Sequence, residues 1–177
     1  MSDRLPSTEA LELRPVPYAH PDAAMLTDLA QSYYISIYGS PDSAPVSDDG
    51  FAPPNGAFFV GYLDGVPVSM GGWRFSGAGV PAEAIRPAEV KRMFVRDEVR
   101  GRGLARQTLA LLEADARRAG ADWLILETGR PQVAAIAFYR AAGYRDIEAF
   151  GYYAGWANSV TLGKRLVGND PTLGRTT

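Results

Sequence analysis

The spacing of apolar residues along the chain predicts three helices. Residues 22–38 repeat apolar side chains at a helical period, and Gly39 follows as a stop. Residues 104–119 repeat them in the same way and carry charged side chains on the opposite face. A third helix is expected over 131–142, because its opening proline suits a first helical turn and a glycine follows its end.

Runs of apolar, aromatic and β-branched residues predict the strands. Two of these runs flank Asp64-Gly65, a strong turn signal, and therefore predict a β-hairpin. The connection 39–55 is long and rich in proline, and a helical turn is expected near residues 47–51. The expected strands are 11–16, 57–63, 66–75, 90–95, 123–127, 144–147 and 160–166.

Strands and helices alternate through the middle of the chain, with the hairpin before them and short strands after. This order predicts the α/β (α+β) class, with a central mixed twisted sheet of about six to seven strands flanked by about four helices. A chain of 177 residues with 46% hydrophobic content suits a single domain over residues 1–177. Its polar ends, 1–9 and 168–177, are expected to be loose tails.

The amino-acid composition excludes several kinds of functional site. The chain has no cysteine, which excludes disulfides, thiolate metal sites and an acyl-cysteine intermediate. Its one histidine, His20, excludes a histidine-based metal cluster and is expected in a solvated loop, so no metal is expected. No apolar run approaches the roughly 20 residues of a membrane span, and residues 1–17 lack the apolar core of a signal peptide. We therefore expect a cytoplasmic protein with no membrane partner.

The net charge of −2 hides an asymmetry. Residues 1–85 hold ten acids and three bases, a charge of −7, whereas residues 86–177 hold ten acids and fifteen bases, a charge of +5. This separation suits an anionic cofactor on the second half and a cationic acceptor near the first. Ordinary solvated faces explain it equally well.

A pair of glycines, Gly101 and Gly103, lies between the expected strand 90–95 and the expected helix 104–119. Free backbone N–H groups at a helix start bind phosphate, and glycines allow it to approach closely. The loop Arg100-Gly101-Arg102-Gly103-Leu104-Ala105 therefore predicts a pyrophosphate site. It lacks the Gly-Lys-Ser/Thr end of a Walker loop, and Arg106 stands where a dinucleotide fingerprint needs a third glycine or alanine. A tight turn without a ligand is the alternative.

The same six residues resemble the Arg/Gln-x-x-Gly-x-Gly/Ala signature of the GNAT-type N-acetyltransferases. Glu89 is placed as in that family's fourth strand, and residues 135–144 are similar to its Ala-x-x-Leu/Phe-Tyr-x-x-x-Gly-Phe/Tyr segment. The resemblance covers roughly residues 57–166. It implies the family's fold and acetyl-CoA as the co-substrate, with the pyrophosphate on the glycine loop and pantetheine on strand backbone.

The resemblance also implies roles for particular residues. Tyr139 matches the tyrosine that faces the coenzyme sulfur and is the candidate acid, with a core aromatic as the alternative. Glu89 stands where many members carry a catalytic glutamate, and Glu127 ends the next strand; a structural ion pair with Arg92 or Arg130 explains either carboxylate equally well. Strand alternation puts Glu89 on one face with Lys91, Met93 and Val95. The implied cofactor-binding residues are Met93, Phe94, Val95, Arg100, Gly101, Arg102, Gly103, Leu104, Ala105, Gln132 and Tyr139.

These features predict an N-acetyltransferase that moves an acetyl group from acetyl-CoA to a primary amine of a small molecule by direct transfer in a ternary complex. Two alternatives stay open: a non-catalytic acyl-CoA-binding module, and an enzyme that acetylates a protein or peptide. Trp73, Tyr152 and Trp156 are candidate acceptor-site residues that could equally seal the core. Gln132 stands where the family often carries asparagine. Nucleic acid is not an expected partner, because the basic cluster overlaps the pyrophosphate loop, and a homodimer stays open.

Overall fold

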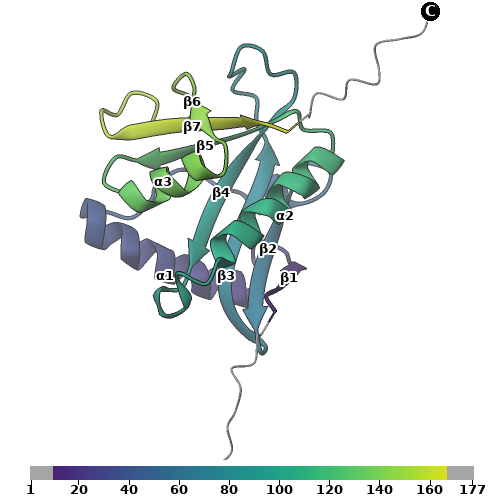
Figure 1. Ribbon diagram of the computed structural model, residues 1–177, viewed down its shortest axis with the longest axis vertical. Helices are drawn as coiled ribbons and strands as arrows, with labels where there is room; N and C mark the ends of the chain where they lie inside the picture. The colour runs from purple at the N-terminus through teal and green to yellow at the C-terminus, as the bar shows by residue number, and fades with distance from the viewer. Residues whose placement is uncertain (1–9, 167–177) are drawn as a thin grey trace, which may run out of the picture. The chain divides into compact units, whose positions relative to one another are not determined.

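The computed structural model describes residues 10–166, and the predicted tails at 1–9 and 168–177 lie outside the described residues. Seven strands form one sheet in the order β1-β2-β3-β4-β5-β7-β6 (Figure 1). The elements are β1 (Glu12–Pro15), α1 (Pro21–Tyr38), the 3-10 turn η1 (Asp48–Phe51), β2 (Gly56–Leu63), β3 (Val66–Phe75), β4 (Pro87–Val95), the 3-10 turn η2 (Asp97–Val99), α2 (Leu104–Arg118), β5 (Trp123–Gly129), α3 (Val133–Ala141), β6 (Arg145–Asp146) and β7 (Ser159–Arg165). The expected α/β class and strand number are confirmed.

The described chain divides into two compact units, each built from two segments. Unit 1 comprises residues 10–74 and Val90–Leu112, and unit 2 comprises Phe75–Glu89 and residues 113–166. β4 and α2 each contribute residues to both units. Across residues 10–166, none of the helices combines the length and the apolar character that a membrane span requires.

Unit 1 is built on the β2–β3 hairpin, with β1 paired antiparallel to β2. Asp64 and Gly65 form its turn with positive φ values of 48° and 77°, as the Asp-Gly signal predicts. The apolar side of α1 packs on the hairpin, and this burial stabilises the helix more than intrinsic propensity does. The core residues that α1 and the hairpin share are Ala23, Leu26, Ala30, Phe58, Val60, Tyr62 and Met70.

α1 begins and ends at capping residues. His20 is the N-cap, and its Nδ1 accepts a hydrogen bond from the backbone N–H of Asp22 at 3.2 Å. Gly39 closes the helix in the left-handed conformation with φ of 75°, and its N–H donates to the carbonyl of Ile35. The helix stop predicted at Gly39 is therefore confirmed, and His20 serves as a cap.

Unit 2 is built around β5. This strand pairs in parallel with the first three residues of β4 and antiparallel with all of β7, which in turn pairs with β6. Trp123, Ile125 and Phe150 form a core cluster of this unit. β5 extends two residues past Glu127, because Thr128 and Gly129 keep ladder partners on β7.

α3 starts at Val133, two residues later than its opening proline predicted. The N–H groups of Arg130 and Gln132 donate to the carbonyls of Asn158 and Gly129, at 2.8 and 2.9 Å, which commits this stretch to a turn. The connection 39–55 forms only η1. The described residues therefore contain three α-helices, one fewer than expected.

Candidate active site

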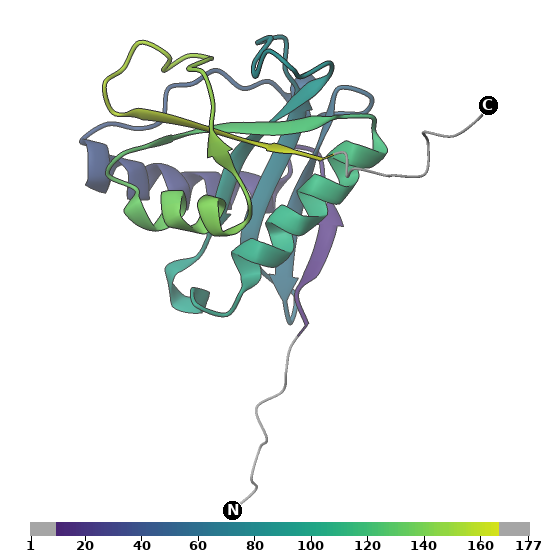
Figure 2. The ribbon, with the colours of Figure 1, turned by 45° about the horizontal axis from the view of Figure 1, so that its top comes forward.

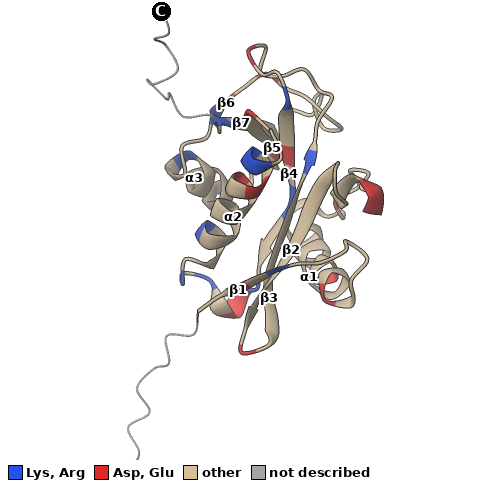
Figure 3. Cartoon of the chain, turned by 90° about the vertical axis from the view of Figure 1, so that its right-hand side faces the viewer, with Lys and Arg blue, Asp and Glu red and all other residues tan. Residues whose placement is uncertain are grey.

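The predicted phosphate loop lies in unit 1, between the end of β4 and the start of α2. The Arg100 Nε donates to the carbonyl of Val95 at 3.2 Å, and its Nη2 pairs with the carboxylate of Asp97 at 2.7 Å. Figure 3 shows basic segments in blue beside an acidic segment in red within this connection. Arg100 therefore ties the loop back to the strand that precedes it.

Gly101 and Gly103 both have left-handed backbones, with φ values of 77° and 78°. A Cβ added at either position would meet no atom within 4 Å. Backbone conformation, not packing, therefore requires glycine here, and the space in front of both residues is open. An open glycine surface of this kind suits the close approach of a pyrophosphate.

The start of α2 presents backbone donors and is held firmly. The N–H of Gln107 makes the first bond of the helix, to the carbonyl of Gly103 at 3.2 Å, so the three preceding amides have no carbonyl inside the helix. Leu104 packs with Leu63 and Val68. The donors at this helix start therefore occupy a fixed position, and these residues fit a pyrophosphate group.

The predicted strand residues alternate between two faces. Phe94 packs against the cluster that α1 shares with the hairpin, whereas Val95 packs beside Leu104. Met93 lies on the same side as Val95. A Cβ added to Gly71 would lie 2.7 Å from the Met93 Sδ and would also meet Leu112 of α2. Arg92 has φ of 60°, which interrupts the extended strand. The alternation that grouped Glu89 with Met93 and Val95 therefore does not extend across Arg92.

Tyr139 lies in the last turn of α3 in unit 2, and its side chain is 7% exposed. Its ring makes edge contacts with Phe138 and Tyr144, with centroids 5.1 and 5.5 Å apart. Gln132 is the N-cap of the same helix and makes no side-chain capping bond. The packing holds the Tyr139 ring in one orientation, which a proton donor requires.

The two candidate carboxylates have different surroundings in unit 2. Glu89 is 5% exposed and lies opposite Ile125, at the last of the three pairs between β4 and β5. Glu127 accepts a hydrogen bond through Oε1 from the backbone N–H of Tyr153 at 3.3 Å. A Cβ on Gly151 would lie 2.7 Å from its Oε2. Glu127 therefore supports the connection between β6 and β7.

That connection, which forms a broad loop in Figure 2, carries the predicted aromatic residues. The Tyr153 ring meets those of Tyr152 and Trp156 edge to face, at 4.8 and 5.1 Å between centroids. Tyr152 is 54% exposed and Trp156 is 62% exposed, so both present aromatic surface to solvent. Trp73 is only 2% exposed, which favours a packing role for it.

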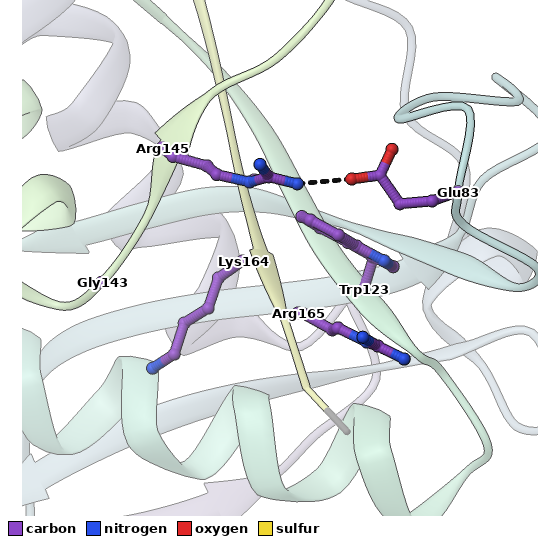
Figure 4. Close-up of a pocket in the computed structure, with 7 residues that line it drawn as sticks. Glu83, Trp123, Gly143, Arg145, Lys164 and Arg165 are labelled. Carbon is purple, nitrogen blue, oxygen red and sulfur yellow. Dashed lines mark hydrogen bonds and ion pairs between the residues drawn. The ribbon is translucent and has the colours of Figure 1, made fainter. Parts of the chain in front are cut away.

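Unit 2 also contains a hollow of about 440 Å³ that no predicted site residue lines (Figure 4). Arg145 reaches across the ring of Trp123 and pairs with Glu83. Lys164 points away toward α2, where Glu113 accepts from its Nζ at 2.9 and 3.0 Å. Most of the lining charges are therefore paired with one another or with their neighbours.

Sequence reasoning missed one pair of charged residues in unit 1. The Arg92 Nη1 lies 3.0 Å from the Asp42 Oδ2, and the arginine side chain is only 6% exposed. The one signal in the sequence was an arginine inside a strand of mostly apolar residues. Its partner lies fifty positions away, in the connection after α1, and no pattern marks it.

The protein is of the mixed α/β class, and its glycine loop at the start of α2 leaves room for a phosphate group. The sequence profile of the Acetyltransferase (GNAT) family matches residues 23–144, and the chain belongs to this family. Membership of this acyltransferase family is what the loop and the 135–144 segment predicted.

Relatives and solved structures agree with this assignment. An IAA acetyltransferase of Azospirillum brasilense is 44% identical over 78 residues, which cover 44% of this chain and 51% of that protein. The match thus spans about half the length of that curated relative. A Klebsiella pneumoniae protein described as an acyl-CoA N-acyltransferase is 26% identical, with a TM-score of 0.71 over 89% of this chain and 98% of its own. The PaiA N-acetyltransferase of Thermoplasma acidophilum, solved with coenzyme A, shares the fold at 12% identity, with a TM-score of 0.65 over 88% of this chain and 99% of its own.

Proposed function

We propose that this protein is an N-acetyltransferase that moves an acetyl group from acetyl-CoA to the primary amine of a small molecule. One observation carries the proposal: in a member of the GNAT family, α2 starts at two left-handed glycines that face open space. The backbone donors at that helix start suit a pyrophosphate. The Azospirillum relative, named an IAA acetyltransferase, supports a small acceptor.

The cofactor would be held by the residues of the loop and of the strand before it. The amides that follow Gly101 and Gly103 would bind the pyrophosphate, and the backbone of residues 93–95 would bind the pantetheine arm. Acetyl-CoA, when bound, supplies an acetyl group activated as a thioester. The side chains of the protein would then have to remove a proton from the amine and donate a proton to the departing thiolate.

Tyr139 is the proposed acid. A thiol has an ordinary pKa of about 8.5, so a departing thiolate needs only a modest donor, and a phenol hydroxyl can provide the proton. The buried and packed ring of Tyr139 supports this role, because its hydroxyl is held in one place.

Glu89 is the proposed base. An alkyl amine has a pKa of about 10.4 and must lose a proton before it can act as a nucleophile. Glu127 accepts a hydrogen bond from the N–H of Tyr153, which favours a supporting role for it. Glu89, which is buried and stands where many family members carry a catalytic glutamate, is the candidate for removing that proton.

We infer direct transfer between the two substrates. Without cysteine no acyl-thiol enzyme can form, which supports a mechanism in which both substrates are bound together when the acetyl group moves. Initial rates measured with small primary amines, as thiol released from acetyl-CoA, should give intersecting lines when both substrates are varied. Parallel lines would overturn the ternary complex. Calorimetry that detects no binding at millimolar coenzyme A would overturn the proposed function.

A further inference from the structure

Arg92 has a backbone conformation that a residue in a strand does not normally adopt. Its φ of 60° lies in the left-handed region, which disfavours any side chain with a Cβ. Among the described residues, the other non-glycine position with positive φ is Asp64, which lies in the hairpin turn. Strain of this kind persists where the surrounding structure holds it, and it re-aims the side chain of the strained residue.

The re-aimed guanidinium is buried and only partly satisfied. Asp42 accepts from Nη1 at 3.0 Å, and the Arg92 side chain is 6% exposed. The Nε–H is shut off from solvent, and no described residue accepts a hydrogen bond from it. A buried guanidinium is costly unless its donors are bonded. The unbonded edge therefore calls for an acceptor group that the described residues do not provide.

Asp42 is held in place from several sides. Its backbone N–H donates to the Gln31 Oε1 at 2.8 Å, and its carbonyl accepts from the Gln31 Nε2 at 3.1 Å. Its Oδ1 accepts from the N–H of Ala44 at 2.9 Å. These bonds fix Asp42 against the Nη1 side of Arg92. The edge that carries Nε remains for another group.

Tyr34 of α1 packs against the core that this helix shares with the hairpin. Burial, with the negative charge of Asp42, raises the pKa of Tyr34 to about 12, and the charge of Arg92 acts against that rise. The phenol therefore keeps its proton in neutral solution and adds no charge to the pair of Arg92 and Asp42.

We propose that Arg92 forms a subsite that binds a carboxylate of the acceptor, so that the preferred acceptors carry both a primary amine and a carboxylate. This inference rests on the proposed function and names its substrate class. The edge of a guanidinium gives two parallel N–H donors, which match the two oxygens of a carboxylate.

The test compares amino acids with the amines that lack their carboxylate, such as phenylalanine with phenethylamine and tryptophan with tryptamine. Rates are compared at the same concentration of neutral amine. The wild type should favour the carboxylate-bearing member by about 10-fold or more in kcat/KM. Equal kcat/KM values for the two members of each pair would overturn the subsite.

Arg92→Gly is the matched truncation, because glycine suits the left-handed backbone and removes only the side chain. The variant should lose the preference for the carboxylate-bearing acceptor, while kcat/KM for phenethylamine stays the same. Guanidinium ion added at millimolar concentration should restore that preference. Arg14→Gln, which removes an exposed arginine paired with Glu12, should leave the preference unchanged. An Arg92→Gly variant that loses the same factor with both acceptors would make Arg92 structural and overturn the subsite.

Binding without turnover separates this inference from the proposed function. Calorimetry measures amino-acid binding to the wild type and to Arg92→Gly with coenzyme A present. Binding that Arg92→Gly loses, without any acetyl transfer, would support the subsite and overturn the proposed function. Transfer to amines with no preference for a carboxylate would overturn the subsite alone.

Discussion

Tyr139 and Tyr144 are joined by the turn that ends α3. The N–H of Tyr144 donates to the carbonyl of Tyr139 at 3.1 Å, and the N–H of Gly143 donates to that of Arg140 at 3.0 Å. These are the two bonds of a Schellman motif, with Gly143 in the left-handed conformation at φ of 93°. The motif brings the two rings into edge contact at 5.5 Å. The turn at Gly143 that ends α3 therefore also positions Tyr139, the candidate acid.

Tyr139→Phe should lower turnover and spare cofactor affinity. The substitution keeps the ring and its packing but removes the proton, so kcat should fall by roughly 10²-fold or more while the Kd for acetyl-CoA stays unchanged. Steady-state kinetics and calorimetry on the folded variant measure the two quantities. Unchanged turnover would mean that Tyr139 has only a packing role and that water protonates the departing thiolate.

Tyr144→Phe is the control for that experiment. The Tyr144 hydroxyl is buried and makes no hydrogen bond to the described residues. Its removal should leave kcat unchanged and should keep or raise the free energy of unfolding, because a buried unbonded hydroxyl is unfavourable.

Gly103→Ala should weaken coenzyme A binding strongly. A Cβ there would occupy the open space in which the pyrophosphate is expected to lie. Gly65→Ala imposes the same left-handed strain, with φ of 77°, in the hairpin turn. Both variants should lose about 1 kcal/mol of stability, but only Gly103→Ala should lose affinity. If calorimetry gave Gly103→Ala and Gly65→Ala the same affinity for coenzyme A, the loop would not be part of the cofactor site.

Glu89→Gln and Glu127→Gln should separate the two candidate bases. Glu127→Gln keeps an oxygen that can accept from the N–H of Tyr153, so we expect kcat within about tenfold of the wild type. Glu89→Gln should lower kcat by roughly 10²-fold. The reverse pattern would make Glu127 the base.

Thr108→Val should destabilise the contact between α2 and β3. The Thr108 hydroxyl donates to the carbonyl of Leu104 at 2.9 Å, so the fully buried Ser69 hydroxyl at 3.2 Å is its donor. The variant leaves that hydroxyl unbonded at a cost of about 1–3 kcal/mol. Urea denaturation of the double variant with Ser69→Ala should show partial recovery. A double variant that loses the sum of both single losses would mean the two side chains are not coupled.

Alkaline solution should destabilise the fold. Burial, followed by the hydrogen bond and charge of Asp22, raises the pKa of Tyr62 to about 12, and Tyr34 reaches a similar value. Burial, with the charge of Glu113 next, raises the pKa of Tyr144 well above its ordinary value. Because the folded state favours the protonated phenols, this stability is complete below pH about 10 and is lost as pH rises toward about 12.

Because these tyrosines lose their protons more readily in the unfolded state, the free energy of unfolding should fall by about 2 kcal/mol as the pH rises from about 9 to about 11. Tyr62→Phe should make that fall shallower. A free energy of unfolding that does not change over this range would contradict the raised pKa values.

The sequence by itself determined the features that act through their own backbone. Asp64-Gly65 makes its turn, Gly39 stops its helix, and Gly101 and Gly103 take left-handed conformations, because each glycine needs only its immediate neighbours to do so. The period of apolar residues predicted α1 and α2 closely for the same reason, since a helix bonds within four positions. The left-handed conformations of the predicted phosphate loop could therefore be predicted from a short stretch of residues.

Only the tertiary structure decided what depends on distant segments. α3 begins late because the N–H of Arg130 bonds to the carbonyl of Asn158. Glu127 supports the aromatic connection through Tyr153, and Arg92 meets Asp42 across fifty positions. No local period or propensity contains such pairings, because they form only when separate elements pack together and exclude water from the groups between them.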